Sequence, residues 1–142
     1  MLTADELGRM LGACTGRPML LAMTVAGRVA LSPADPLDAR IVAAFNAHQR
    51  RGRMLGPDAV SAAVDQLRGT GADVVVRPSP WRLGAGHADL MAVWFEGWVA
   101  AACAQEPALA DEAGAYRDRR LAQAAAGELV VTVDHADLLV LP

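Results

Sequence analysis

The segment Pro18-Met19-Leu20-Leu21-Ala22-Met23-Thr24-Val25 is the stretch of sequence that decides the fold. Its side chains are apolar at odd and even positions alike, and a strand of that kind is usually buried between two layers, as in a parallel sheet. Two further strands are expected at Asp73–Arg77 and Glu128–Leu141. Because helices are expected between these strands, the sequence predicts an α/β domain with helices on both faces of a small sheet.

The helices are predicted from apolar residues at helical spacing. The most regular pattern runs from Ala88 to Gln105. Thr3 and Glu6 form a capping box before the first helix. The remaining signals are Asp35 as the cap of a second helix, Gly56-Pro57-Asp58 at the start of a third, and a fifth helix that ends at Gly127. Val29–Leu31 is expected to return along the first strand as a hairpin.

Length and composition limit the possible classes of protein. The chain has 142 residues, of which 54% are hydrophobic and 20% charged, so we expect one domain over residues 1–142 rather than disorder. A formal net charge of −3 provides no basic field for nucleic acid. Cys14 and Cys103 lie too far apart for a disulfide framework or a zinc cluster, so no metal site is expected. The sequence also lacks a basic signal peptide and an apolar run of about 20 residues, so we expect a cytoplasmic protein without membrane contact.

One polar cluster interrupts an otherwise apolar helix, and it contains Asn46, His48 and Gln49. Histidine side chains in general can take up and release a proton near neutral pH, so His48 is a candidate general base. The alternative is a structural histidine at a helix C-terminus, where the helix dipole favours positive charge. The following Arg50-Arg51-Gly52-Arg53 run is either an anion site or a solvated loop.

A second candidate site follows the strand Asp73–Arg77, where Trp81 and Arg82 come directly after Pro78-Ser79-Pro80. Ligands of open α/β sheets bind beyond the carboxyl ends of the strands. A planar ring beside a guanidinium suits an aromatic or anionic ligand. The alternative is a loop tryptophan that folds onto the core.

Several segments together resemble a known family. In order, they are Leu21-Ala22-Met23-Thr24-Val25-Ala26-Gly27-Arg28-Val29, Asp35-Pro36-Leu37-Asp38, Phe45-Asn46-Ala47-His48-Gln49, Leu55-Gly56-Pro57-Asp58-Ala59, Arg77-Pro78-Ser79-Pro80-Trp81-Arg82-Leu83 and His135-Ala136-Asp137-Leu138-Leu139. The set is similar to the C-terminal half of a bacterial class I S-adenosylmethionine-dependent methyltransferase, from about Pro18 onward.

The resemblance implies a partial Rossmann-like methyltransferase sheet that contains the last three strands of seven. Pro18–Ala26 resembles strand five, Asp73–Arg77 strand six, and Glu128–Leu141 the antiparallel strand seven, which lies between the other two. The cofactor implied is S-adenosylmethionine, but the family's glycine-rich motif has no match in this chain. The resemblance therefore implies a substrate-side wall that acts on a small molecule. His48 is its candidate catalytic residue, and Asn46, Gln49, Trp81 and Arg82 are candidate substrate-binding residues.

Two functions follow from this resemblance. In the first, the chain is the C-terminal portion of a methyltransferase, and a strand of the N-terminal half pairs with the edge of Pro18–Ala26. In the second, it is a non-catalytic binding or assembly module, and the same edge is covered by self-association or by the N-terminal helix, since an open apolar edge promotes aggregation.

Overall fold

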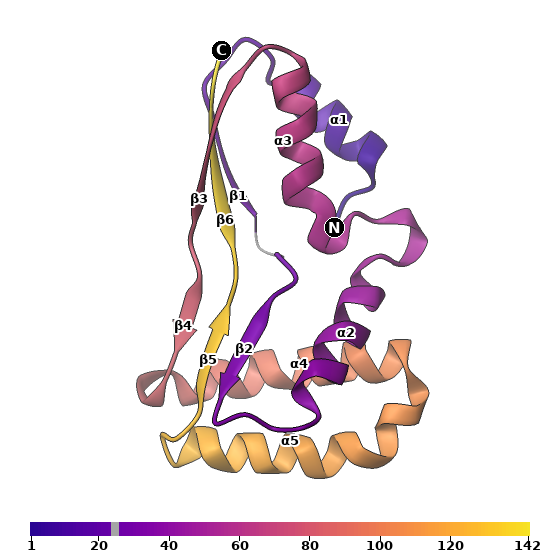
Figure 1. Cartoon of the computed structure of the whole chain (residues 1–142), viewed down its shortest axis with the longest axis vertical. Coiled ribbons are helices and arrows are strands. Elements are labelled where there is room, and N and C mark those ends of the chain that lie inside the picture. Colours follow the sequence, from indigo (N-terminus) through magenta and orange to yellow (C-terminus); the bar gives the residue numbers. More distant parts are fainter. Residues whose placement is uncertain (24–25) are drawn as a thin grey trace. The chain divides into compact units, whose positions relative to one another are not determined.

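The computed structural model describes residues 1–23 and 26–142, and it contains helices and two small antiparallel sheets (Figure 1). The chain divides into two compact units, and each is described by itself. The first unit comprises residues 1–27, 49–80 and 134–142. The second comprises residues 28–48 and 81–133. Both units are therefore assembled from segments that lie far apart in the sequence.

The sheet of the first unit has the order β1-β6-β3. Its strands are β1 (Met19–Met23), β3 (Asp73–Pro78) and β6 (Ala136–Leu141). The central strand β6 runs antiparallel to both neighbours, with Leu138 opposite Leu21 on one side and Val76 on the other. Consequently β1 and β3 run parallel to each other. The predicted end of the first strand at Thr24 and Val25 lies outside the described residues.

Both helices of the first unit lie on the same face of this sheet. They are α1 (Ala4–Ala13), which begins with the predicted capping box, and α3 (Ala59–Gly69), which follows the short 3₁₀ helix η2 (Gly56–Asp58). Their apolar side chains pack against alternate strand residues, among them Val74, Leu138 and Val140. The prediction of helices on both faces is therefore wrong for this sheet. Its other face carries Leu20, Leu139 and Leu141, which are 73%, 42% and 40% exposed.

The second unit contains a sheet that the sequence did not predict, with the order β2-β5-β4. Its strands are β2 (Val29–Ser32), β4 (Trp81–Leu83) and β5 (Val130–Val133), all antiparallel to their neighbours. The expected hairpin return of β2 onto β1 is wrong, because β2 pairs with β5. The closing strand is also divided: β5 lies in this sheet and β6 in the other, since each half pairs with different strands.

Helices α4 and α5 cover one face of the second sheet. The buried cluster between them contains Met91 of α4 and Ala124 of α5, together with Leu83 of β4, Val131 of β5 and Leu129 just before β5. α4 (Ala88–Gln105) has the predicted bounds, and α5 spans Ala110–Ala125. The remaining helix is α2 (Asp38–Gln49). Three further 3₁₀ turns are η1 (Arg51–Arg53), η3 (Ala85–His87) and η4 (Pro107–Leu109).

The core of the second unit is aromatic. Phe95, Trp98 and Tyr116 are almost completely buried, together with Ile41 from α2. The rings of Trp94 and Trp98 stack with centroids 5.0 Å apart, and Phe95 meets Trp98 edge-on at 5.5 Å. Such ring pairs add to the free energy gained from burial. Trp98 is therefore a core residue of this unit.

Candidate functional site

The polar cluster of the sequence lies on the last turns of α2. Asn46, His48 and Gln49 are all half-buried. Asn46 and Gln49 are three residues apart and therefore neighbours on the helix surface, whereas His48 is two residues from Asn46 and points to another side. Asn46 and His48 belong to the second unit and Gln49 to the first. Their proposed roles toward a substrate remain predictions.

Trp81 and Arg82 are residues of β4, not of a loop after a strand. Because side chains alternate along a strand, the two residues lie on opposite faces of the β2-β5-β4 sheet. Trp81 shares a face with its partner Val133 and is 47% exposed, while Arg82 stands opposite Thr132 on the other face. The ring and the guanidinium therefore extend from opposite faces of this sheet. The individual roles of the two residues toward a substrate stay predictions.

The carboxyl ends of β1 and β3 form the edge of the first sheet at which the resemblance places a substrate. At this edge Asp137 of β6 stands between Ala22 and Arg77. Beyond the strand pairing, the Ser79 N–H donates to the His135 carbonyl at 3.0 Å. Polar side chains of opposite charge thus lie on neighbouring strands where β1 and β3 end.

Two of the segments that carry the resemblance meet in the first unit. Gly56 has φ +50°, and a Cβ built on it would lie 2.9 Å from the carbonyl carbon and oxygen of Gln49. Only glycine fits such a close approach in the left-handed region. The contact therefore explains why a glycine stands between Leu55 and Pro57, and it fixes the end of α2 against the start of η2.

The adjacent arginine run is partly used by the fold. The Arg50 guanidinium donates to both carboxylate oxygens of Asp58, at 2.7 and 2.9 Å. This hydrogen bonding lowers the pKa of Asp58 and raises that of Arg50. For Arg50 the geometry favours a structural role over the alternative of an anion site.

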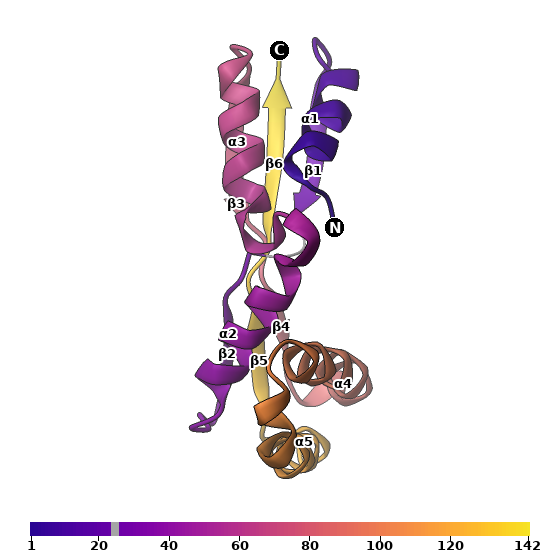
Figure 2. The same ribbon diagram turned by 90° about the vertical axis from the view of Figure 1, so that its right-hand side faces the viewer.

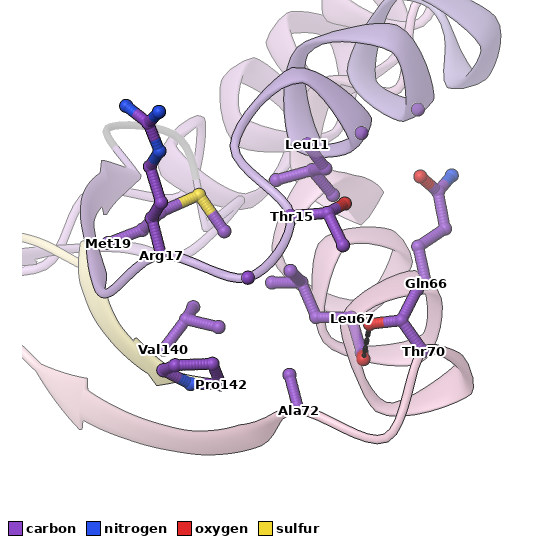
Figure 3. Close-up of a pocket in the computed structure, with 13 residues that line it drawn as sticks. Leu11, Thr15, Arg17, Met19, Gln66, Leu67, Thr70, Ala72, Val140 and Pro142 are labelled. Atoms are coloured by element: carbon purple, nitrogen blue, oxygen red, sulfur yellow. Dashed lines mark hydrogen bonds between the residues drawn. The ribbon is translucent and has the colours of Figure 1, made fainter.

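The first unit contains a cavity of about 120 Å³ that the sequence did not indicate (Figure 3). Leu11, Met19, Leu67 and Val140 supply apolar walls. The Thr70 hydroxyl donates to the Leu67 carbonyl at 2.7 Å. The cavity adjoins the start of β1, which is the opposite end of the strand from the edge described above. It therefore offers a small apolar volume away from the predicted substrate side.

A buried ion pair connects α2 and α5 in the second unit. The Arg120 side chain is 1% exposed, and its Nη2 donates to Oδ1 and Oδ2 of Asp38 at 2.6 and 2.7 Å. Nη1 donates to the Pro33 carbonyl and to Oε1 of Gln123. The Tyr116 hydroxyl donates to Asp38 Oδ1 at 2.6 Å. A single nitrogen thus contacts both carboxylate oxygens, and the further hydrogen bonds offset part of the cost of burying the guanidinium, whose Nε is buried without a hydrogen-bond partner.

The hydrogen bonds of this network indicate a structural role rather than a catalytic one. Burial, reinforced by the Asp38 carboxylate, raises the pKa of Tyr116, so the phenol stays protonated and donates. Asp38 Oδ2 also accepts the Asp35 N–H at 2.9 Å. The carboxylate thus accepts four hydrogen bonds from three donor groups and is not directed at a ligand. The sequence signal was weak, since only the four-residue spacing of Tyr116 and Arg120 on one helix suggested that they meet.

The described residues 1–23 and 26–142 contain no group of three or more His, Cys, Asp or Glu side chains that could hold a metal ion. Cys14 and Cys103 are free thiols, and burial raises the pKa of Cys103. No helix within this described part has both the length and the apolar character needed to cross a membrane. No protein-family model, curated protein or solved structure matches the chain.

Proposed function

We propose that the chain is the C-terminal, substrate-side portion of a class I S-adenosylmethionine-dependent methyltransferase that acts on a small molecule. The order of the first sheet carries this proposal. The last strand of the chain lies between two parallel strands and runs antiparallel to both, in the order β1-β6-β3. The resemblance implies this arrangement for the same three segments.

The uncovered parts of the first unit support the same proposal. Among the residues that the structure describes in this three-stranded sheet, β1 pairs only with β6. Leu20 on β1 is 73% exposed. An apolar strand with an unpaired edge is normally continued by another strand. The preceding strand of a methyltransferase sheet would occupy that edge.

The residues of this chain do not themselves fit S-adenosylmethionine. A glycine-rich turn that holds a nucleotide cofactor follows a strand and opens a helix. Here Gly12 lies in the last turn of helix α1, Gly16 follows that helix rather than a strand, and the backbone of Gln49 lies directly against Gly56. We therefore assign the chain substrate contacts only. His48 would accept a proton from a hydroxyl or acidic carbon of the substrate.

The coding DNA upstream of Met1, read in the same frame, tests the proposal first. We expect it to encode a strand, a glycine-rich turn and an acidic residue after the next strand. Isothermal titration should then detect S-adenosylmethionine binding to the longer chain and none to residues 1–142. A stop codon directly upstream, with no neighbouring gene that encodes the missing half, would contradict the proposal.

Activity of the completed protein tests the role of His48. His48→Ala should lower kcat by at least about 10²-fold, as expected for loss of a general base. His87→Ala is the matched control, because exposed His87 makes only a local contact, in which its Nδ1 accepts the Gly84 N–H. Equal activity of the two variants would remove His48 from the mechanism.

A non-catalytic assembly module is the second candidate function. It is favoured by the apolar residues Leu20, Leu139 and Leu141 on the uncovered face of the first sheet. Exposed apolar patches of this kind mark interaction surfaces. Size-exclusion chromatography of residues 1–142 discriminates the candidates, because a stable monomer without aggregation speaks against a missing half.

A further inference from the structure

Helix α4 is apolar on nearly every side, although only part of it is buried in the second unit. Met91, Phe95 and Trp98 are among the residues on its buried face. The opposite face carries exposed apolar residues at spacings of three and four, which form one continuous seam: Leu90, Val93, Gly97, Ala100 and Ala104. A helix that is apolar all round is normally enclosed, and this spacing is typical of a seam between two helices.

The exposure of this seam is substantial. Val93 is 73% exposed and Leu90 is 45% exposed. Beside the seam, α4 and α5 enclose a groove of about 640 Å³ in which Gly97, Ala100 and Gly114 leave room for side chains from outside. The two helices are neighbours that share one core cluster, and Figure 2 views them end-on. The seam and the groove therefore form one surface with both protruding and receding parts.

The surface is complementary to itself when a second copy approaches antiparallel. The large residues Leu90 and Val93 lie on the N-terminal side of Gly97, and the small ones lie on its C-terminal side. A two-fold axis at Gly97 would place Leu90 of each copy over Ala104 of the other, so large residues meet small ones. In a parallel pair, by contrast, Leu90 and Val93 would meet their own copies and the small residues would leave gaps.

The charges of the groove agree with this arrangement. Glu96 and Arg117 line the same groove and carry opposite signs. A two-fold interface uses the same patch on both subunits, so a residue that contacts another across the axis is contacted by it in return. Within its own chain Arg117 donates to Asp118 through Nε and Nη2, at 3.2 and 3.0 Å, which leaves further N–H groups of the guanidinium for a second carboxylate. In the proposed arrangement, Glu96 of each copy would provide that carboxylate for Arg117 of the other.

We propose that the chain forms a two-fold homodimer through α4, with the helices antiparallel and crossing at Gly97. This surface lies in the second unit and is independent of the methyltransferase proposal. It is also distinct from the edge of β1, which belongs to the first unit.

Sedimentation equilibrium of residues 1–142 tests the dimer. We expect the unaltered chain to sediment as a dimer, and Val93→Glu to raise the dissociation constant by at least about tenfold, because a carboxylate replaces a central apolar contact. Leu20→Glu is the matched control, since Leu20 is equally exposed at 73% but lies on β1. A monomeric unaltered chain, or a dimer lost in Leu20→Glu and retained in Val93→Glu, would overturn the proposal.

Charge reversal and cross-linking test the direction of the helices. Glu96→Arg and Arg117→Glu should each weaken the dimer, and the double variant should restore it. In a chain with Cys14 and Cys103 replaced by serine, Gly97→Cys should cross-link two copies upon oxidation. Leu90→Cys alone should not, whereas the Leu90→Cys and Ala104→Cys chains, when mixed, should cross-link. Efficient cross-linking of Leu90→Cys to itself would overturn the antiparallel arrangement.

Discussion

The first unit packs α1 and α3 on its sheet through aliphatic side chains, whereas the second unit buries an arginine, a tyrosine and a cluster of aromatic rings. The aromatic residues are also distributed unequally between the units: all 3 tryptophans, the 1 tyrosine and both phenylalanines lie in the second unit. Intrinsic fluorescence therefore follows the second unit, and the first unit must be followed through its backbone. Each unit is therefore stabilised by a different kind of interaction, and substitutions can perturb the two units separately.

A large effect is expected from the loss of the buried ion pair of the second unit. Arg120→Met should lower the free energy of unfolding by about 3 kcal/mol, because the Asp38 carboxylate, only 18% exposed, would lose the charge that balances it. Urea unfolding, monitored by tryptophan fluorescence, measures this change in the free energy of unfolding. Arg119→Met is the control: Arg119 also pairs with a carboxylate, that of Asp35, but its side chain is 53% exposed, and the cost should stay within about 1 kcal/mol. Equal costs for the two variants would contradict a special role of Arg120.

The corresponding change in the first unit is Leu138→Ala. Leu138 is completely buried in the central strand, so its truncation should cost about 2–5 kcal/mol. The adjacent Leu139 is 42% exposed on the other face, and Leu139→Ala should change the free energy of unfolding by no more than about 0.5 kcal/mol. Far-ultraviolet circular dichroism in urea measures both. A larger cost for Leu139 would mean that the uncovered face of the sheet is covered in solution.

A smaller loss of stability is expected from a substitution at Gly56, where the segments Phe45–Gln49 and Leu55–Ala59 are in contact. Gly56→Ala should cost about 1–3 kcal/mol, since a Cβ there meets the Gln49 carbonyl in a left-handed conformation. Gly52 also has a positive φ, of +62°, but its Cβ would meet nothing within 4 Å. Gly52→Ala should therefore lower the free energy of unfolding by only about 1 kcal/mol, the cost of placing an alanine in the left-handed conformation. Thermal unfolding of both variants provides the comparison, and equal costs would show that the close approach is relieved without penalty.

The sequence predicted local features of both units well. The capping box of Thr3 and Glu6 is present, and α4 has its expected bounds, because both depend on residues a few positions apart. It failed where distant segments decide the structure. β2 pairs with β5, about a hundred positions away, and Asp38 binds Arg120, 82 positions away. The periodicity of apolar residues and the spacing of motifs along the sequence do not reveal partners that lie so far apart.

The candidate site shows the same limit. Asn46 and Gln49 are neighbours on α2 because they are three residues apart, whereas His48 points to another side of the helix. The expectation of a loop after Pro80 was wrong for a local reason: the chain continues there as a strand, so the side chains of Trp81 and Arg82 alternate between its faces. A turn was the natural expectation after two prolines in three residues, and only the pairing with β5 shows otherwise.

The strand order of the first unit is the observation on which the functional proposal rests, and nuclear magnetic resonance tests it most directly. Cross-strand nuclear Overhauser effects should connect β6 to both neighbours, with Leu138 close to Leu21 on one side and to Val76 on the other. Effects that connect β1 to β2 as a hairpin, with none between β1 and β6, would contradict the order β1-β6-β3 and remove the support for the methyltransferase proposal.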